Sequence, residues 1–256
     1  MIFQFIIGTA GSGKSTLCSA LSNYMNSQEE IDAITVNLDP GTKNLPYRPD
    51  IDIREFINTE EIMLQYNLGL NGGIIASVDM IINYINDLKD EIEILKPDHV
   101  IIDTPGQMEL FAYRSIGKFL ISNLIDKNGG ILYLVDPNLA KTPSGYLSTL
   151  LLGLSVQIRY HVPQIYLLSK IDILSEKEFE NILNWSNNED KLKNAIESES
   201  IGEKREFNIA VNSLLNKINL CGSLLPISSL RPETMLNLYA EISRIFLGGK
   251  DFDEEF

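Results

Sequence analysis

Residues 8–15 read Gly-Thr-Ala-Gly-Ser-Gly-Lys-Ser, which matches the pattern Gly-x-x-x-x-Gly-Lys-Ser/Thr at every fixed position. The stretch follows an apolar run, residues 3–7, and opens a segment typical of a helix, residues 14–25. Glycines let such a loop curl so that successive backbone N–H groups point at phosphate oxygens, and the positive end of the following helix adds to the attraction. In this context the pattern predicts a phosphate-binding loop at the end of a buried strand.

The residues of this loop have different expected roles. Lys14 can reach the β- and γ-phosphates of a bound nucleotide, and the Ser15 hydroxyl can coordinate Mg²⁺. Further contacts with the nucleotide are expected from Gly11, Ser12, Gly13 and Thr16.

Apolar runs alternate with helix-like segments along the chain. The runs that indicate buried strands are residues 3–7, 33–38, 99–102, 130–135 and 163–169. The helix-like segments are residues 14–25, 73–93, 110–125 and 144–160. This order predicts an α/β P-loop fold over residues 1–256, a single domain with a doubly wound, mostly parallel sheet and helices on both faces. Ligands of such folds bind at the C-terminal ends of the strands.

Two stretches depart from the alternation. Residues 175–219 are polar and helix-compatible, with sparse apolar positions, and are interpreted as a helical insertion or lid at the nucleotide face. An ordinary pair of surface helices without a catalytic role is the alternative. The tail, residues 250–256, is short and acidic.

Composition limits the classes of partner. The formal net charge is -14, so the surface repels nucleic acid and anionic lipid, and neither DNA nor a membrane is expected as a partner. The spacing of the two cysteines, Cys18 and Cys221, does not forbid a disulfide, but they are interpreted as buried free thiols. No apolar run approaches the roughly 20 residues that span a bilayer, and the chain opens without a secretory leader pattern. These features together predict a cytoplasmic protein.

A second motif, Asp103-Thr104-Pro105-Gly106, follows the strand expected at residues 99–102. An aspartate at this place is suited to holding Mg²⁺, often through water, and the Gly106 N–H can meet the γ-phosphate. Gln107 and Glu109 come next, where a residue that orients an attacking water is needed. A simple strand-end turn is the alternative interpretation.

A third motif, Ser169-Lys170-Ile171-Asp172, follows the strand at residues 163–169. A carboxylate here can accept hydrogen bonds from guanine N1–H and its exocyclic amine, and the Lys170 stem can lie over the base. The usual motif is Asn-Lys-x-Asp, so Ser169 stands in place of asparagine. Later in the chain, Ser228 lies in a small-residue loop that could support the guanine O6, although an ordinary turn explains it equally well.

Two more stretches flank the second expected strand. Residues 36–40 read Val-Asn-Leu-Asp-Pro and lead into Leu-Pro-Tyr-Arg-Pro-Asp-Ile-Asp-Ile-Arg at residues 45–54. Asp39 is thereby placed beside the phosphate-binding loop, where it could bind the metal's water shell or position the attacking water. Residues 67–73 read Asn-Leu-Gly-Leu-Asn-Gly-Gly at the start of a helix, and their N–H groups could pack against phosphate.

With these motifs the chain resembles the GPN-loop GTPases, over residues 8–229 and with five motifs in that family's order. The resemblance implies a homodimer in which two nucleotide sites face each other and the signature loop reaches the partner's phosphates. Gly69 and Asn71 match that signature, whereas Leu70 stands where the family has proline. It also implies that Asp39, Asn71, Gln107 and Glu109 place and polarise the water. Asp103 and Ser15, with Asp39, form the Mg²⁺ side.

The sequence therefore predicts a Mg²⁺-dependent GTPase that converts GTP to GDP and phosphate by in-line attack of water, acting as a slow switch or assembly factor with protein partners. Three alternatives stay open. One is an ATP-dependent switch of the MinD type, which stays possible because Ser169 departs from the usual guanine-binding motif. Another is a nucleotide-bound scaffold with negligible turnover. The third, a nucleotide kinase, would need an arginine-lined second pocket, for which residues 175–219 supply only Arg205.

Overall fold

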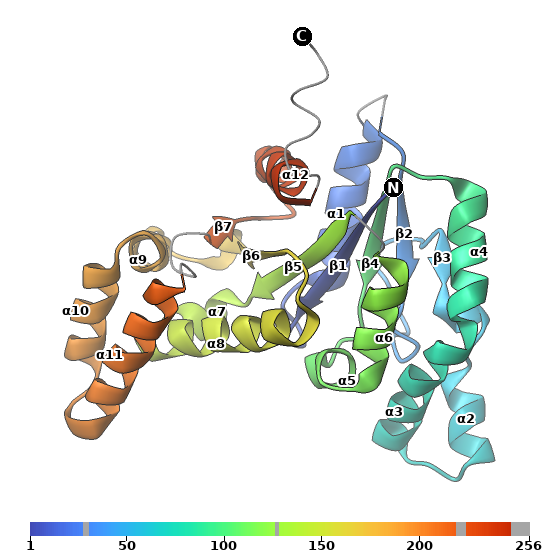
Figure 1. Ribbon diagram of the computed structural model, residues 1–256, viewed down its shortest axis with the longest axis horizontal. Coiled ribbons are helices and arrows are strands. Elements are labelled where there is room, and N and C mark those ends of the chain that lie inside the picture. Colours follow the sequence, from blue (N-terminus) through green and yellow to red (C-terminus); the bar gives the residue numbers. More distant parts are fainter. Residues whose placement is uncertain (28–30, 126–127, 219–223, 247–256) are drawn as a thin grey trace.

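The computed structural model describes residues 1–27, 31–125, 128–218 and 224–246. Its core is a seven-stranded sheet in the order β3-β2-β4-β1-β5-β6-β7, in which every neighbouring pair is parallel (Figure 1). The strands are β1 (Ile2–Gly8), β2 (Ala33–Asn37), β3 (Ile51–Asp52), β4 (His99–Asp103), β5 (Gly129–Val135), β6 (Gln164–Leu168) and β7 (Leu224–Pro226). The predicted doubly wound P-loop fold and its five long strands are confirmed.

Helices cover both faces of the sheet because the strands alternate their side chains between two apolar cores. Ile6 of β1 faces the core that is closed by α1 (Lys14–Ser27) and α12 (Pro232–Phe246). Phe5 and Ile7 face the larger core on the other side. The helices with residues in that larger core include α2 (Thr59–Gln65), α3 (Leu70–Met80), α4 (Ile85–Leu95), α5 (Met108–Ala112), α6 (Ser115–Leu124), α7 (Pro137–Ala140) and α8 (Pro143–Tyr160).

The strand register brings the functional loops to one edge. In β1 and β2, Ile6 and Asn37 both pair with Asp103 of β4. The phosphate-binding loop after β1, the loop after β2 and the turn after β4 therefore leave the sheet at the same level. This edge is where a parallel sheet places its ligands.

Two helices expected as continuous segments are interrupted. The segment at residues 73–93 begins earlier, at Leu70, and tightens into a 3-10 turn at Ile81–Tyr84 between α3 and α4. The segment at residues 110–125 is divided into α5 and α6. There the Tyr160 hydroxyl donates a 2.8 Å hydrogen bond to the Phe111 carbonyl oxygen. In an unbroken helix this oxygen would instead accept from the N–H of Ser115, four residues later. A tertiary contact thus explains this break, which the apolar period could not indicate.

The segment at residues 175–219 is described as far as residue 218. It contains α9 (Glu176–Asn187), α10 (Glu189–Glu199) and α11 (Gly202–Lys217). Ser175 and Glu178 form a capping box at the start of α9, and the Trp185 ring lies 6.1 Å from the Tyr146 ring of α8. These helices lie at the β6 side of the sheet, away from α2 and α3 (Figure 1). The single-domain boundary and the role of this segment stay predictions, and the tail at residues 250–256 lies outside the described residues.

Membrane-spanning length was assessed over the described ranges. No individual helix there is long and apolar enough to cross a bilayer. One pair of helical segments, Thr59–Gln65 and Leu70–Leu95, has the length and composition of a membrane span when taken together, but the two segments are bent by 111° relative to each other. Cys18 is a buried free thiol, as predicted, while Cys221 lies outside the described residues.

Candidate functional site: a phosphate-binding loop and its neighbours

The phosphate-binding loop connects β1 to α1 through backbone conformations that require glycine. Gly11 has φ +75° and Gly13 has φ +102°, both in the region that side chains disfavour. A Cβ at Gly8 would lie 2.7 Å from the Ser12 hydroxyl oxygen, so the loop closes tightly on itself. The Ser12 hydroxyl is buried and has no hydrogen-bond partner among the described residues.

Lys14 is buried at the start of α1, with its ammonium group held by backbone carbonyls. Nζ donates to the oxygens of Gly8 at 2.9 Å, Thr9 at 3.0 Å and Gly106 at 3.0 Å. Burial lowers the pKa of Lys14, while the nearby carboxylates of Asp103, Asp39 and Glu109 oppose that shift. The ammonium group therefore bridges the loops after β1 and β4, where the phosphates of a nucleotide would lie.

Asp103 ends β4 and is 1% exposed. Burial raises the pKa of its carboxyl to about 6, although the nearby Ser15 and Tyr47 hydroxyls and Lys14 act to lower it. The Tyr47 hydroxyl donates to Oδ2 at 3.1 Å, and burial raises the pKa of Tyr47, which keeps that hydroxyl protonated. Oδ1 is buried and has no hydrogen-bond partner among the described residues. The Ser15 hydroxyl lies near the carboxylate.

This arrangement fits Mg²⁺. The ion usually takes one or two carboxylates together with phosphate oxygens and waters, rather than a complete protein cage. Asp103 offers an unsatisfied carboxylate oxygen, and Ser15 offers a hydroxyl beside it. The pair expected from the sequence is therefore brought together.

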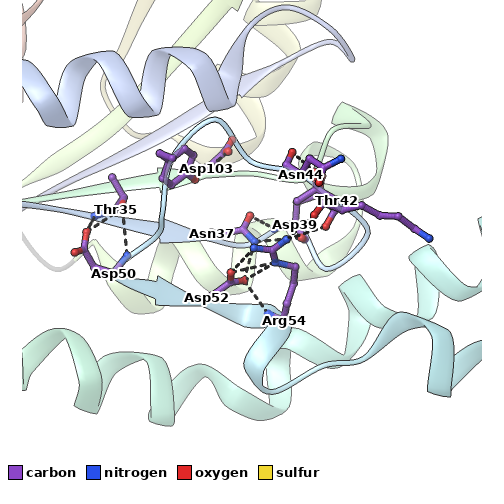
Figure 2. Close-up of polar contacts among 11 residues, drawn as sticks. Thr35, Asn37, Asp39, Thr42, Asn44, Asp50, Asp52, Arg54 and Asp103 are labelled. Carbon is purple, nitrogen blue, oxygen red and sulfur yellow. Dashed lines mark hydrogen bonds and ion pairs between the residues drawn. The ribbon is translucent and has the colours of Figure 1, made fainter.

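Asp39 follows β2 and is bonded at both carboxylate oxygens. Oδ2 accepts from the Gly106 N–H at 2.9 Å, and Oδ1 accepts from the Gly41 N–H at 2.9 Å. The Asn37 side-chain oxygen also accepts from the Asp39 N–H at 3.0 Å (Figure 2). Asp39 is thus fixed between the turn after β4 and its own loop.

A second layer of bonds holds that loop from the β3 side. The Asp52 carboxylate accepts from Asn37 Nδ2 at 2.9 Å and from both Nε and Nη2 of Arg54, as Figure 2 shows. Arg54 also donates to the Thr42 carbonyl at 3.1 Å. Burial opposes ionisation of Asp52, but the bonds from Arg54 and Asn37 outweigh it and lower the pKa of Asp52 below its usual value.

Three of the predicted base-binding residues, Ser169, Lys170 and Asp172, line a cavity of about 370 Å³ after β6. The Lys170 ammonium donates to the Gly11 carbonyl, and the aliphatic part of the Lys170 side chain packs against Gly13 of the phosphate-binding loop. The Asp172 carboxylate accepts from the Ser228 hydroxyl. The cavity lining comprises Ser12, Gly13, Thr16, Leu17, Leu134, Ser169, Lys170, Asp172, Ile173, Ile227, Ser229 and Leu230.

Two serines near this cavity have distinct structural roles. Ser169 is buried, and its hydroxyl donates to the Val135 carbonyl at 3.1 Å, so it ties the end of β6 to the end of β5. Ser228 is fully buried, its hydroxyl donates to Asp172, and its neighbour Ser229 is the one that lines the cavity. The expected support of the guanine O6 by the Ser228 loop stays a prediction.

The remaining candidates for water placement are exposed. Gln107 and Glu109 lie at the start of α5, and their side chains form no hydrogen bond within the described ranges. Glu109 is close enough to Lys14 to influence its pKa. Asn71 lies in the first turn of α3, at the end of the α2–α3 hairpin that extends past the C-terminal ends of the strands (Figure 1). The structure joins Asn71 to no residue of the phosphate-binding loop, among those described, so the catalytic roles stay predictions.

Two features were not predicted from the sequence. Tyr47 contacts Asp103, although only its place in the quoted motif at residues 45–54 indicated importance. A cavity of about 560 Å³, larger than the one after β6, lies beside Asp39's loop. Its lining comprises Pro40, Gly41, Thr42, Lys43, Arg54, Ile57, Asn58, Thr59, Glu60, Met63, Leu64, Leu70 and Ile74.

Comparisons with known proteins agree on one family. A family model described as "Conserved hypothetical ATP binding protein" matches residues 6–247. A GPN-loop GTPase of Pyrococcus abyssi is 40% identical over 182 residues, which cover 70% of this chain and 71% of that protein. GPN-loop GTPase 3 of Dictyostelium discoideum is 30% identical over 98% of this chain and 88% of that protein. The crystal structure of a Pyrococcus abyssi GTPase in its apo form has a TM-score of 0.85 at 31% identity, covering 95% of this chain and 96% of that one. The chain therefore belongs to the GPN-loop GTPase family.

Proposed function

We propose that the protein binds GTP together with Mg²⁺ and hydrolyses it to GDP and phosphate. The observation that carries the proposal is the convergence of three elements at one sheet edge. These are the phosphate-binding loop with Lys14, the Asp103–Ser15 pair, and the cavity bordered by Lys170 and Asp172. The names of the relatives, which are called GTPases, support the same activity.

Selectivity for guanine follows from the chemistry of Asp172. Its carboxylate is only an acceptor, and guanine presents two adjacent donors, N1–H and the exocyclic amine. Adenine lacks that pair. The Ser228 hydroxyl holds Oδ1 and so orients the carboxylate. The description of the matching family model names ATP instead, so hydrolysis of ATP is the second candidate function.

Hydrolysis would proceed by in-line attack of a water on the γ-phosphate. Lys14 and backbone N–H groups of the loop hold the phosphates, and Mg²⁺, when bound through Asp103 and Ser15, neutralises phosphate charge. Asp39, Gln107 and Glu109 are the carboxylate and amide groups at this edge that can accept a proton from the water or orient it. Turnover should be slow, as suits a switch.

The deciding experiment is hydrolysis of GTP and ATP side by side, with and without Mg²⁺, using Lys14→Ala as the binding-deficient blank. Slow, Mg²⁺-dependent turnover that prefers GTP is the expected result. Preference for ATP would select the second candidate. Tight GTP binding without turnover above the blank would reject the hydrolase and favour a nucleotide-bound scaffold.

The proposal includes a homodimer in which Asn71 acts at the partner's phosphates. Asn71 lies in the first turn of α3, and the structure joins it to no described residue of its own phosphate-binding loop, which supports this arrangement. A mixture of Lys14→Ala and Asn71→Ala chains tests it, because one site of each mixed dimer would combine an intact Lys14 with an intact Asn71. Recovered turnover supports the arrangement, and activity no higher than the sum of the separate variants rejects it. A cytoplasmic location and protein partners also remain proposals.

A further inference from the structure

Tyr47 lies in the loop between β2 and β3, far from Asp103 in sequence but in contact with it. Its hydroxyl donates a 3.1 Å hydrogen bond to Asp103 Oδ2. The ring is half-buried and packs against the apolar core that α1 and α12 share. A residue of the loop after β2 therefore reaches the carboxylate that ends β4.

The loop that carries Tyr47 is fixed on its far side by Asp50. The Asp50 carboxylate accepts from the Thr35 N–H at 2.7 Å and from the Thr35 hydroxyl at 2.9 Å (Figure 2). The Asp50 N–H in turn donates to the Thr35 carbonyl at 3.0 Å. These bonds attach the loop to β2 three residues after Tyr47, so the phenol is held in place from both its ring and its backbone.

The two oxygens of Asp103 consequently differ. Oδ2 is occupied by Tyr47, whereas Oδ1 is buried and has no partner among the described residues. Turning the carboxylate out of its present plane would give up the Tyr47 bond, which costs about 0.5–1.5 kcal/mol, or more because the acceptor is charged. The bond therefore selects one orientation of a buried carboxylate that also has the Ser15 hydroxyl beside it.

We propose that Tyr47 is a positioning residue for the Mg²⁺ side of the nucleotide site: its hydroxyl occupies Asp103 Oδ2 and thereby presents Oδ1 to the cation. Outer contacts of this kind orient metal ligands and tune cation affinity. The inference rests on the proposed function, since the cation is the one that accompanies the nucleotide.

The test is Tyr47→Phe, which removes the hydroxyl and keeps the ring. Binding of fluorescent GDP is measured in EDTA and across a Mg²⁺ titration. The half-saturating Mg²⁺ concentration should rise by about tenfold or more. Affinity in EDTA should stay unchanged, because the hydroxyl that is removed bonds to Asp103 on the cation side.

Tyr24→Phe is the matched control. Tyr24 packs against the same core, and its hydroxyl forms no hydrogen bond within the described ranges. An unchanged Mg²⁺ requirement in Tyr47→Phe, an equal loss of affinity in EDTA, or an equal shift in Tyr24→Phe would each overturn the positioning role. A wild-type protein whose nucleotide binding does not respond to Mg²⁺ would instead overturn the proposed function itself, and this inference with it.

Discussion

The backbone N–H of Gly106 donates a 2.9 Å hydrogen bond to Oδ2 of Asp39, and so joins the turn after β4 to the loop after β2. Gly106 is also the donor expected to meet a γ-phosphate. A γ-phosphate and Asp39 are both anionic acceptors, so one N–H cannot serve them equally. Binding of GTP should therefore release Asp39 from Gly106, whereas GDP leaves this bond intact.

Replacement of Asp39 by alanine removes the competing acceptor. We expect the preference for a non-hydrolysable GTP analogue over GDP to rise about fivefold, the equivalent of roughly one neutral hydrogen bond. Turnover should fall by about 100-fold or more if Asp39 also handles the proton of the attacking water. Fluorescent-nucleotide titrations and single-turnover rates measure the two effects. Asp87→Ala, an exposed change on α4, is the control, and parallel loss of affinity for both nucleotides in Asp39→Ala would contradict the competition.

Much of this edge could be predicted from the sequence, because its motifs are local. The phosphate-binding loop can be predicted from Gly8–Ser15 and the segments on either side alone. The position of Asp103 at the end of a strand follows from the continuous apolar run before it. The Asp39–Gly106 bond could not be predicted, since it depends on the register that pairs Asn37 with Asp103 across two strands. Strand β3 was missed because its two residues, Ile51–Asp52, are too few to show a period.

The bonds around Asp52 predict a measurable pH dependence. The pKa of Asp52 is lower in the folded protein, so its contribution to stability is present above the unfolded-state pKa of about 3.9 and is lost as the pH falls through the lower folded value. Asp52→Asn should therefore lower the Tm at pH 7, and its deficit relative to wild type should shrink below about pH 4. Thermal unfolding from pH 3 to pH 7 measures this.

The Lys43–Glu60 pair provides the control for Asp52. Its side chains are 81% and 77% exposed, so Glu60→Gln should change stability by only about 0.5 kcal/mol or less across the pH range. If Asp52→Asn behaved like Glu60→Gln, the contact of Asp52 with Arg54 and Asn37 would not stabilise the loop.

Replacement of Asp172 by asparagine should alter base preference without harming phosphate binding. The amide exchanges one acceptor for a donor, which suits xanthine, whose 2-oxo group replaces the amine of guanine. We expect GTP affinity to fall by about tenfold or more, since a charge-assisted hydrogen bond contributes about 1.5–3 kcal/mol, while affinity for xanthosine triphosphate rises. Titrations with GTP, xanthosine triphosphate and ATP measure this. An equal loss for all three would show that Asp172 supports the cavity and does not read the base.

Leu70 occupies the first position of α3, where the resemblance to the family implies a proline. The backbone around Leu70 already suits a proline. The preceding Gly69 has φ -73° and ψ 172°, the extended conformation that proline imposes on its neighbour. The first N–H of a helix has no partner within the helix, and Leu70 is 63% exposed, so the substitution removes no hydrogen bond of the helix and little packing. Leu70→Pro should therefore stabilise the protein by about 0.4–1 kcal/mol by restricting the unfolded chain, and should raise the Tm by roughly 1–4 °C. Leu70→Ala separates this gain from loss of the exposed side chain, and Ile74→Pro, inside the same helix, should destabilise by about 3 kcal/mol. A Tm for Leu70→Pro at or below that of Leu70→Ala would mean that this helix start needs a freedom that proline removes.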